Sequence, residues 1–187
     1  MKLKDITNRE ESFAKYLNEN NLTNIGVEVG VKYGKNADKL LTNWVGKRLF
    51  LIDNWPISKI KAAAVQKLKH HAPRYTLIHN TSLKALEKFE DNTLDFCYID
   101  AKHTYNRVKQ DVYGWYLKTK PGGVLAGHDY NVKDINYIDE NTRRKKPWRH
   151  IGVKKAVDEF VKEKNILLHV EPAEFRKSSS WYITKEK

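Results

Sequence analysis

The chain has 187 residues, of which 40% are hydrophobic and 31% are charged, a composition typical of one globular domain and not of a disordered protein. No apolar run approaches the roughly 18 residues that a membrane span needs, and the polar first residues do not resemble the core of a signal peptide. We therefore expect a single domain, residues 1–187, of an intracellular, cytoplasmic protein with no membrane span.

The formal net charge is +12, which favours anionic partners such as nucleic acid, an acidic glycan or a phosphorylated substrate. The lysines are spread along the whole chain, and the only dense basic cluster is 143–146. A solvated surface explains most of the excess charge, so nucleic acid is the less favoured partner. Cys97 is the only cysteine and lies inside an apolar run, which predicts a core residue.

Hydrophobic periodicity predicts an amphipathic helix over about 9–20, followed by strands that alternate with helices. The strands are expected in the segment 24–34 and at 48–53, 75–79, 94–100 and 124–129, and the helices at 36–44, 58–71, after 80–82 and at 104–118. Such βα repeats imply a parallel sheet with helices on both faces and the carboxyl ends of its strands along one rim.

The remainder of the chain has a different pattern. Residues 130–151 are polar and basic, show no period and follow the fifth strand, so we interpret them as a substrate lid. A helix is predicted over 152–164. Strands are predicted at 166–170 and 180–184, and because their connection is too short for a crossover helix, they should form an antiparallel hairpin.

The segment 24–34 is an apolar run that reaches Glu28 and then breaks at glycines before a helix, a pattern typical of a nucleotide-binding turn. Its glycines stand at 26, 30 and 34, not in the Gly-x-Gly-x-x-Gly order of a pyrophosphate-binding turn. A dinucleotide-dependent dehydrogenase is therefore the weaker interpretation.

This layout resembles the class I S-adenosylmethionine-dependent methyltransferases over nearly the whole chain. Residues 28–34 resemble that family's acid-x-Gly-x-x-x-Gly motif, and Asp53 resembles the acid at the end of strand two that holds the ribose hydroxyls. The resemblance implies a Rossmann-like α/β sandwich around a mostly parallel seven-stranded sheet, in the order 3-2-1-4-5-7-6 with the last strand antiparallel. It also implies S-adenosylmethionine as cofactor, bound by Glu28, Gly30, Tyr33, Gly34, Asp53, Trp55, Thr81, Ser82 and Asp100.

Two later segments, 98–105 and 121–130, resemble a subgroup of small metal-dependent sugar and macrolide O-methyltransferases and cephalosporin-biosynthesis methyltransferase-like proteins. The resemblance implies that Asp100 and Asp129 hold Mg²⁺ and that His103 is the general base, with Asp100 also counted as catalytic. His128 stands where the metal-binding relatives have a carboxylate, and as a third ligand it would shift the preference towards Mn²⁺ or another transition metal.

Several of these residues also have structural interpretations. Trp55 could stack on adenine or cover the core, Thr81 and Ser82 could contact adenine or cap a helix, and His103 could cap the helix that follows it. Asp95 and Asp111 are interpreted as structural.

The leading hypothesis is an O-methyltransferase acting on a hydroxyl of a sugar, a glycan or a small metabolite. The alternatives are an RNA methyltransferase and a non-catalytic binding protein on the same fold. The sequence leaves the acceptor, the metal and the oligomeric state open, including whether the chain forms a homo-oligomer.

Overall fold

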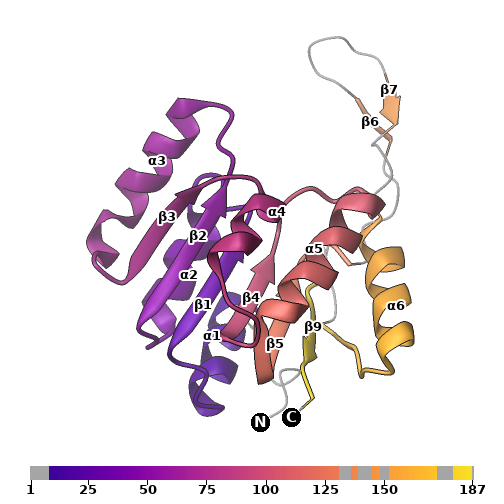
Figure 1. Ribbon diagram of the computed structural model, residues 1–187. Helices are drawn as coiled ribbons and strands as arrows, with labels where there is room; N and C mark the ends of the chain where they lie inside the picture. The colour runs from indigo at the N-terminus through magenta and orange to yellow at the C-terminus, as the bar shows by residue number, and fades with distance from the viewer. Residues whose placement is uncertain (1–8, 131–135, 139–144, 148–151, 172–178, 187) are drawn as a thin grey trace.

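The computed structural model describes residues 9–130, 136–138, 145–147, 152–171 and 179–186. Its centre is a seven-stranded sheet in the order β3-β2-β1-β4-β5-β9-β8 (Figure 1). The first five strands are parallel, and β9 runs antiparallel to both β5 and β8. The predicted topology is therefore confirmed. The strands are β1 (Ile25–Val29), β2 (Arg48–Asp53), β3 (Tyr75–His79), β4 (Leu94–Ile99), β5 (Thr119–Gly127), β8 (His169–Val170) and β9 (Trp181–Thr184).

The central strand β4 is buried along its whole length, as its mostly apolar sequence, which includes the buried Asp95, predicts for a parallel strand covered on both faces. Its side chains alternate between two cores: Phe96 and Tyr98 belong to one hydrophobic cluster, while Cys97 and Ile99 belong to the other. Cys97 is thus a fully buried core residue, as predicted.

The helices form a layer on each face of the sheet (Figure 1). One hydrophobic cluster packs α1, α2 and α3 against the sheet, and the other packs α4, α5 and α6 against the opposite face. None of the described helices combines the length and apolarity that crossing a membrane requires. The helices are α1 (Arg9–Glu19), α2 (Lys35–Asn43), α3 (Ser58–Leu68), α4 (Ser82–Ala85), α5 (Tyr105–Lys118) and α6 (Val153–Lys164).

Some predicted boundaries are wrong. The helix expected over 58–71 ends at Leu68 and continues as a 3-10 turn, η2 (Lys69–His71), and α4 likewise continues as η3 (Leu86–Lys88). Strand β5 begins at Thr119 instead of 124, so the Pro-Gly-Gly run lies inside it. The reason is tertiary pairing: the Gly122 N–H donates to the Lys185 carbonyl at 2.8 Å, and the Lys185 N–H donates to the Gly123 carbonyl at 2.9 Å.

The predicted lid, about 130–151, falls largely outside the described residues. Within it the structure describes a separate two-stranded antiparallel sheet, β6 (Asn136–Ile138) with β7 (Lys145–Pro147), where the sequence predicts no regular structure. Figure 1 shows this pair apart from the seven-stranded sheet.

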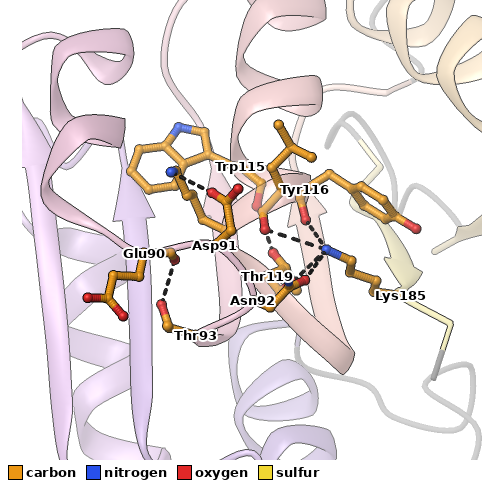
Figure 2. A network of polar contacts seen from close by, with 10 residues as sticks. Glu90, Asp91, Asn92, Thr93, Trp115, Tyr116, Thr119 and Lys185 are labelled. Carbon is orange, nitrogen blue, oxygen red and sulfur yellow. Dashed lines mark hydrogen bonds and ion pairs between the residues drawn. The ribbon is translucent and has the colours of Figure 1, made fainter.

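Lys185, just beyond β9, closes the carboxyl-terminal end of α5 (Figure 2). Its Nζ atom donates to the carbonyls of Tyr116 and Thr119, each at 2.9 Å, and to the Asn92 side chain at 2.8 Å. It also lies over the Tyr116 ring, 4.7 Å from the centroid. The last carbonyls of a helix lack partners within the helix and carry partial negative charge, so a cation there satisfies them and ties the last strand to α5.

Candidate functional site

The carboxyl ends of β1, β2, β4 and β5 meet along one rim, and the backbone links the segments that leave them. The Gly30 N–H donates to the Ile52 carbonyl, and the Asp100 N–H donates to the Val29 carbonyl, both at 2.8 Å. The His128 N–H donates to the Ile99 carbonyl at 3.2 Å. The residues that follow these strands are thus held side by side, where ligands bind in open α/β sheets.

Gly30 makes the turn after β1 and could not be another residue without strain. Its φ of 96° lies in the left-handed region, and a Cβ atom placed there would lie 2.1 Å from the carbonyl oxygen of Asp100. Gly34 follows at the N-cap of α2, and Tyr33 between them is 42% exposed. The turn therefore presents bare backbone at the rim and brings the end of β1 against the end of β4.

Glu28 lies in β1, just before this turn, and its carboxyl group is buried. Only 1% of its surface is exposed, and burial raises its pKa to about 8, against a hydrogen bond from Asn36 that lowers it. The charges of Asp100 and Asp53 raise the pKa further. Its Oε2 atom has no hydrogen-bond partner among the described residues. Leaving a buried hydrogen-bond acceptor without a partner costs free energy. A ligand that brings a hydrogen-bond donor to this oxygen would remove that cost.

Asn36 was not predicted from the sequence. It is the second residue of α2, and its side chain makes the hydrogen bond that lowers the pKa of Glu28. The signal available in the sequence was its position two residues after the last glycine of the motif.

Asp53, at the end of β2, is held by backbone on both oxygens. Oδ2 accepts from the Lys32 N–H at 2.8 Å, and Oδ1 accepts from the Trp55 N–H at 2.7 Å. The Trp55 ring is 3% exposed and lies in the core, with its Nε1 donating to the Lys32 carbonyl at 2.9 Å. The burial of this ring supports its interpretation as a cover for the core.

Thr81 and Ser82 begin α4 near the end of β3. Thr81 is the N-cap, and its side chain accepts from the Lys84 N–H. The Ser82 hydroxyl donates to the buried Asp111 carboxylate and accepts from the indole N–H of Trp115 at 2.9 Å. Both side chains therefore have structural partners, and Asp111 has the structural place predicted for it.

The rim also gathers Asp100, His103 and Asp129 from two different strand ends. The Nε2 atom of His103 lies 3.2 Å from Oδ1 of Asp100, and its Nδ1 atom lies 3.1 Å from Oδ2 of Asp129. Asp129 has a φ of 61°, a left-handed conformation that aspartate tolerates better than most residues. Burial acts to lower the pKa of His103, but the hydrogen bond to Asp100 and the two carboxylate charges outweigh it, so the pKa is raised.

His128 lies beside this cluster. Its Nδ1 atom is 2.9 Å from Oδ1 of Asp129. At the rim, however, the group of side chains whose possible metal-ligand atoms all lie within 4.8 Å of one another consists of Asp100, His103 and Asp129. The structure thus groups His103, and not His128, with the two aspartates.

Two carboxylates and an imidazole at this separation fit a divalent metal ion. Oxygen donors suit Mg²⁺, while a nitrogen donor in the set suits Mn²⁺ or Zn²⁺ better. Asp100 and Asp129 are the residues that would hold either kind of ion.

Both flanks of the segment after β5 are anchored. The Tyr130 N–H donates to the Ser179 carbonyl at 3.1 Å, and the Gly152 N–H donates to the His103 carbonyl at 2.7 Å. A Cβ atom on Gly152 would lie 2.4 Å from Cα of Tyr105, so only glycine allows this approach. The backbone that carries His103 is therefore bonded directly to the start of α6.

The chain also matches a known protein family. A family model described as a methyltransferase domain matches residues 27–130, which is more than half of the chain. The matched region runs from β1 through the Gly30 turn to the residue after Asp129, and so contains every rim residue described above.

Solved structures show the same fold. An O-methyltransferase from Bacillus cereus in complex with SAH has a TM-score of 0.68 at 18% identity, covering 97% of this chain and 83% of its own. The O-methyltransferase TomG from Streptomyces achromogenes, in complex with SAM, has a TM-score of 0.66 at 12% identity, covering 97% and 82%. An rRNA methylase from Streptococcus thermophilus has a TM-score of 0.67 at 12% identity, covering 97% and 99%.

The chain is also similar in sequence to the uncharacterized protein y4gI of Sinorhizobium fredii. It is 25% identical over 123 residues, which are 59% of this chain but only 14% of that longer protein. The family match and the sheet order together confirm the sequence-based assignment: the chain belongs to the methyltransferase domain family, and its fold is that of the class I S-adenosylmethionine-dependent methyltransferases.

Proposed function

We propose that the chain is an O-methyltransferase that moves a methyl group from S-adenosylmethionine to a hydroxyl of a sugar, a glycan or a small metabolite. The observation that carries this proposal is the cluster of Asp100, His103 and Asp129 on the rim. It lies against the Gly30 turn, because the backbone of Asp100 is in contact with that glycine. A proton acceptor therefore stands next to the expected cofactor turn.

S-adenosylmethionine, the methyl donor of this family, would supply the activated methyl group. The unpartnered Oε2 of Glu28 is placed to accept from the cationic amino group of its methionine part, and Gly30 allows close approach. Asp53 would hold the ribose hydroxyls. Its oxygens already accept one N–H each, and a carboxylate oxygen has room for a second donor.

His103 is the proposed general base. As the acceptor oxygen attacks, one ring nitrogen of neutral His103 exchanges its carboxylate contact for the acceptor hydroxyl and takes the hydroxyl proton, a role that adds typically 10²- to 10⁴-fold in rate. The carboxylates of Asp100 and Asp129 orient the ring and stabilise the imidazolium that forms, which is the same effect that raises its pKa. A divalent ion held by Asp100 and Asp129 would lower the pKa of a bound hydroxyl.

The test is transfer of a labelled methyl group from S-adenosylmethionine to a panel of sugars, glycans and diols, with and without Mg²⁺ or Mn²⁺. We expect label in one class of hydroxyl acceptor and its loss in His103→Ala. Calorimetry should show that His103→Ala binds S-adenosylhomocysteine like the wild type, while Glu28→Ala binds it more weakly. Full methyl transfer by His103→Ala would contradict the assignment of the base.

A second candidate is an RNA methyltransferase, favoured by the net charge of +12. If RNA is the acceptor, its affinity should fall steeply between about 50 and 200 mM salt, because lysines and arginines release counterions from phosphates. Weak binding that does not change with salt would remove this candidate.

A further inference from the structure

A second cluster of metal-binding side chains lies away from the strand ends, between α2 and the turn that ends α3. The Nε2 atom of His71 lies 2.9 Å from Oδ1 of Asp38, and the Nε2 atom of His70 lies 3.3 Å from the same oxygen. The two imidazole rings face each other with centroids 3.9 Å apart and an angle of 41° between their planes. Two consecutive histidines thus each direct their Nε2 atom at the same carboxylate oxygen of Asp38.

These separations fit a metal site, and in the absence of an ion His71 and Asp38 are within hydrogen-bond distance. The donor atoms of Asp38, His70 and His71 all lie within 4.8 Å of one another. Ligand atoms held 2.0–2.1 Å from a tetrahedral ion lie roughly 3.3 Å apart, close to both separations from Asp38. Two imidazole nitrogens and one carboxylate oxygen are donors that suit Zn²⁺ and its transition-metal neighbours better than Mg²⁺ or Ca²⁺.

The backbone on both sides of the cluster is fixed without any ion. Asp38 lies in the first turn of α2, where its N–H donates to the Gly34 carbonyl at 3.0 Å. On the other side, the N–H of Arg74 donates to the His71 carbonyl at 2.9 Å, and its guanidinium donates to the Leu41 carbonyl at 2.8 Å. Because Leu41 is also in α2, the helix and the turn are held at a set distance, and an ion would find its ligands already in place.

Access to the cluster is open on one side. The side chain of His71 is only 8% exposed, whereas that of His70 is 64% exposed and that of Asp38 is 29% exposed. His71 thus forms the base of the cluster, and solvent can reach it past His70. An ion can enter from this side and keep water as its fourth ligand.

We propose that Asp38, His70 and His71 form a binding site for a divalent transition-metal ion of the zinc class, distinct from the Asp100 cluster. The ion fastens the first turn of α2, directly after the Gly34 end of the cofactor turn, to the end of α3. This proposal does not depend on the identity of the methyl acceptor.

The test is calorimetric titration with Zn²⁺ of a chain in which His103→Ala and Asp129→Asn remove the rim cluster. We expect one Zn²⁺ per chain and a rise in melting temperature on saturation. Adding His70→Ala should weaken Zn²⁺ binding by at least tenfold. Since His70 is mostly exposed, this substitution leaves the core untouched, and Asp38→Asn provides a second loss of a ligand.

The matched control is His169→Ala in the same background, which removes a histidine outside both clusters and should leave Zn²⁺ affinity and stoichiometry unchanged. Titration with Co²⁺ should give the strong visible absorption of a tetrahedral ion, and His70→Ala should abolish it. Equal Zn²⁺ affinity with and without His70→Ala and Asp38→Asn would overturn the proposal, as would the absence of binding in the parent chain.

Discussion

The Nδ1 atom of His103 lies 3.1 Å from Oδ2 of Asp129, although His103 precedes α5 and Asp129 follows β5. The pairing depends on the neighbouring places of β4 and β5 in the sheet and on the left-handed backbone of Asp129. Asp100 holds the other ring nitrogen, so the position of the imidazole is set from both sides. His103 is the residue on which the proposed chemistry depends most.

Substitution of His103 therefore gives the first prediction. His103→Ala should lower the rate of methyl transfer by about 10²- to 10⁴-fold, the usual contribution of a general base. Asp129→Asn should cause a smaller loss, because the ring keeps its contact with Asp100. Initial rates at saturating cofactor provide the measurement. His169→Ala is the control and should keep the wild-type rate; an equal loss there would mean that the effect is not specific to the rim.

Proton release on cofactor binding gives the second prediction. The folded-state pKa of Glu28 is about 8, so at pH 7 the carboxyl group carries a proton in the free protein. A cationic amino group beside Oε2 lowers that pKa, and the proton leaves, so binding near pH 7 should release about one proton and strengthen as the pH rises towards 8.

Calorimetry with S-adenosylmethionine in buffers of different ionisation enthalpy measures this release. Glu28→Gln cannot release the proton, so its apparent binding enthalpy should be the same in every buffer. A wild-type enthalpy that is also independent of the buffer would place the cofactor's ammonium away from Glu28.

The buried Asp111 gives the third prediction. Burial raises its pKa from 3.8 to about 6, against the hydrogen bond from Ser82 and the charge of Arg107 that lower it. The folded state then binds the proton more tightly than the unfolded state, so this group's contribution to stability falls as the pH rises from about 4 to about 6. Asp111→Asn keeps an acceptor for Ser82 and removes the titration.

Urea denaturation at pH 4 and pH 7 tests this directly. Relative to the wild type, Asp111→Asn should gain stability between the two values. If the difference between the two proteins is the same at both pH values, Asp111 does not titrate as its burial implies.

Lys185 gives the fourth prediction. Lys185→Met keeps most of the aliphatic stem but leaves the carbonyls of Tyr116 and Thr119 without this donor, which should cost about 1–3 kcal/mol of unfolding free energy. Lys155→Met is the matched control: that side chain is 69% exposed and lies 3.9 Å from Glu159, so its loss should change stability by less than about 0.5 kcal/mol. Equal effects would show that Lys185 does not secure the end of α5.

The topology could be predicted because its signals are local in the sequence: the spacing of the apolar residues, the glycines and prolines that interrupt them, and the lengths of the connections. Strand β2 has the predicted limits, and the short final connection correctly indicated an antiparallel β8–β9 pair. The start of β5 could not be predicted, because Gly122 and Gly123 extend the strand only by pairing with Lys185. Pairing with Lys185, which is distant in the sequence, outweighs the local preference of Pro-Gly-Gly for a turn.

The rim residues could be predicted as a group, because parallel strands bring their carboxyl ends together. Their individual contacts could not. Nothing local in the sequence indicates that the His103 ring lies between both aspartates while the His128 ring lies beside Asp129. The bond between Ser82 and Asp111 likewise joins residues that only the packing of α4 on α5 brings together.

The two fixed flanks of the segment after β5 have a consequence for how this scaffold can change. Tyr130 is bonded to Ser179, and Gly152 is bonded to the backbone of His103, so both boundaries belong to the rigid frame of the rim. A longer or shorter connection between Tyr130 and Gly152 would therefore enter and leave the rim at the same two backbone hydrogen bonds.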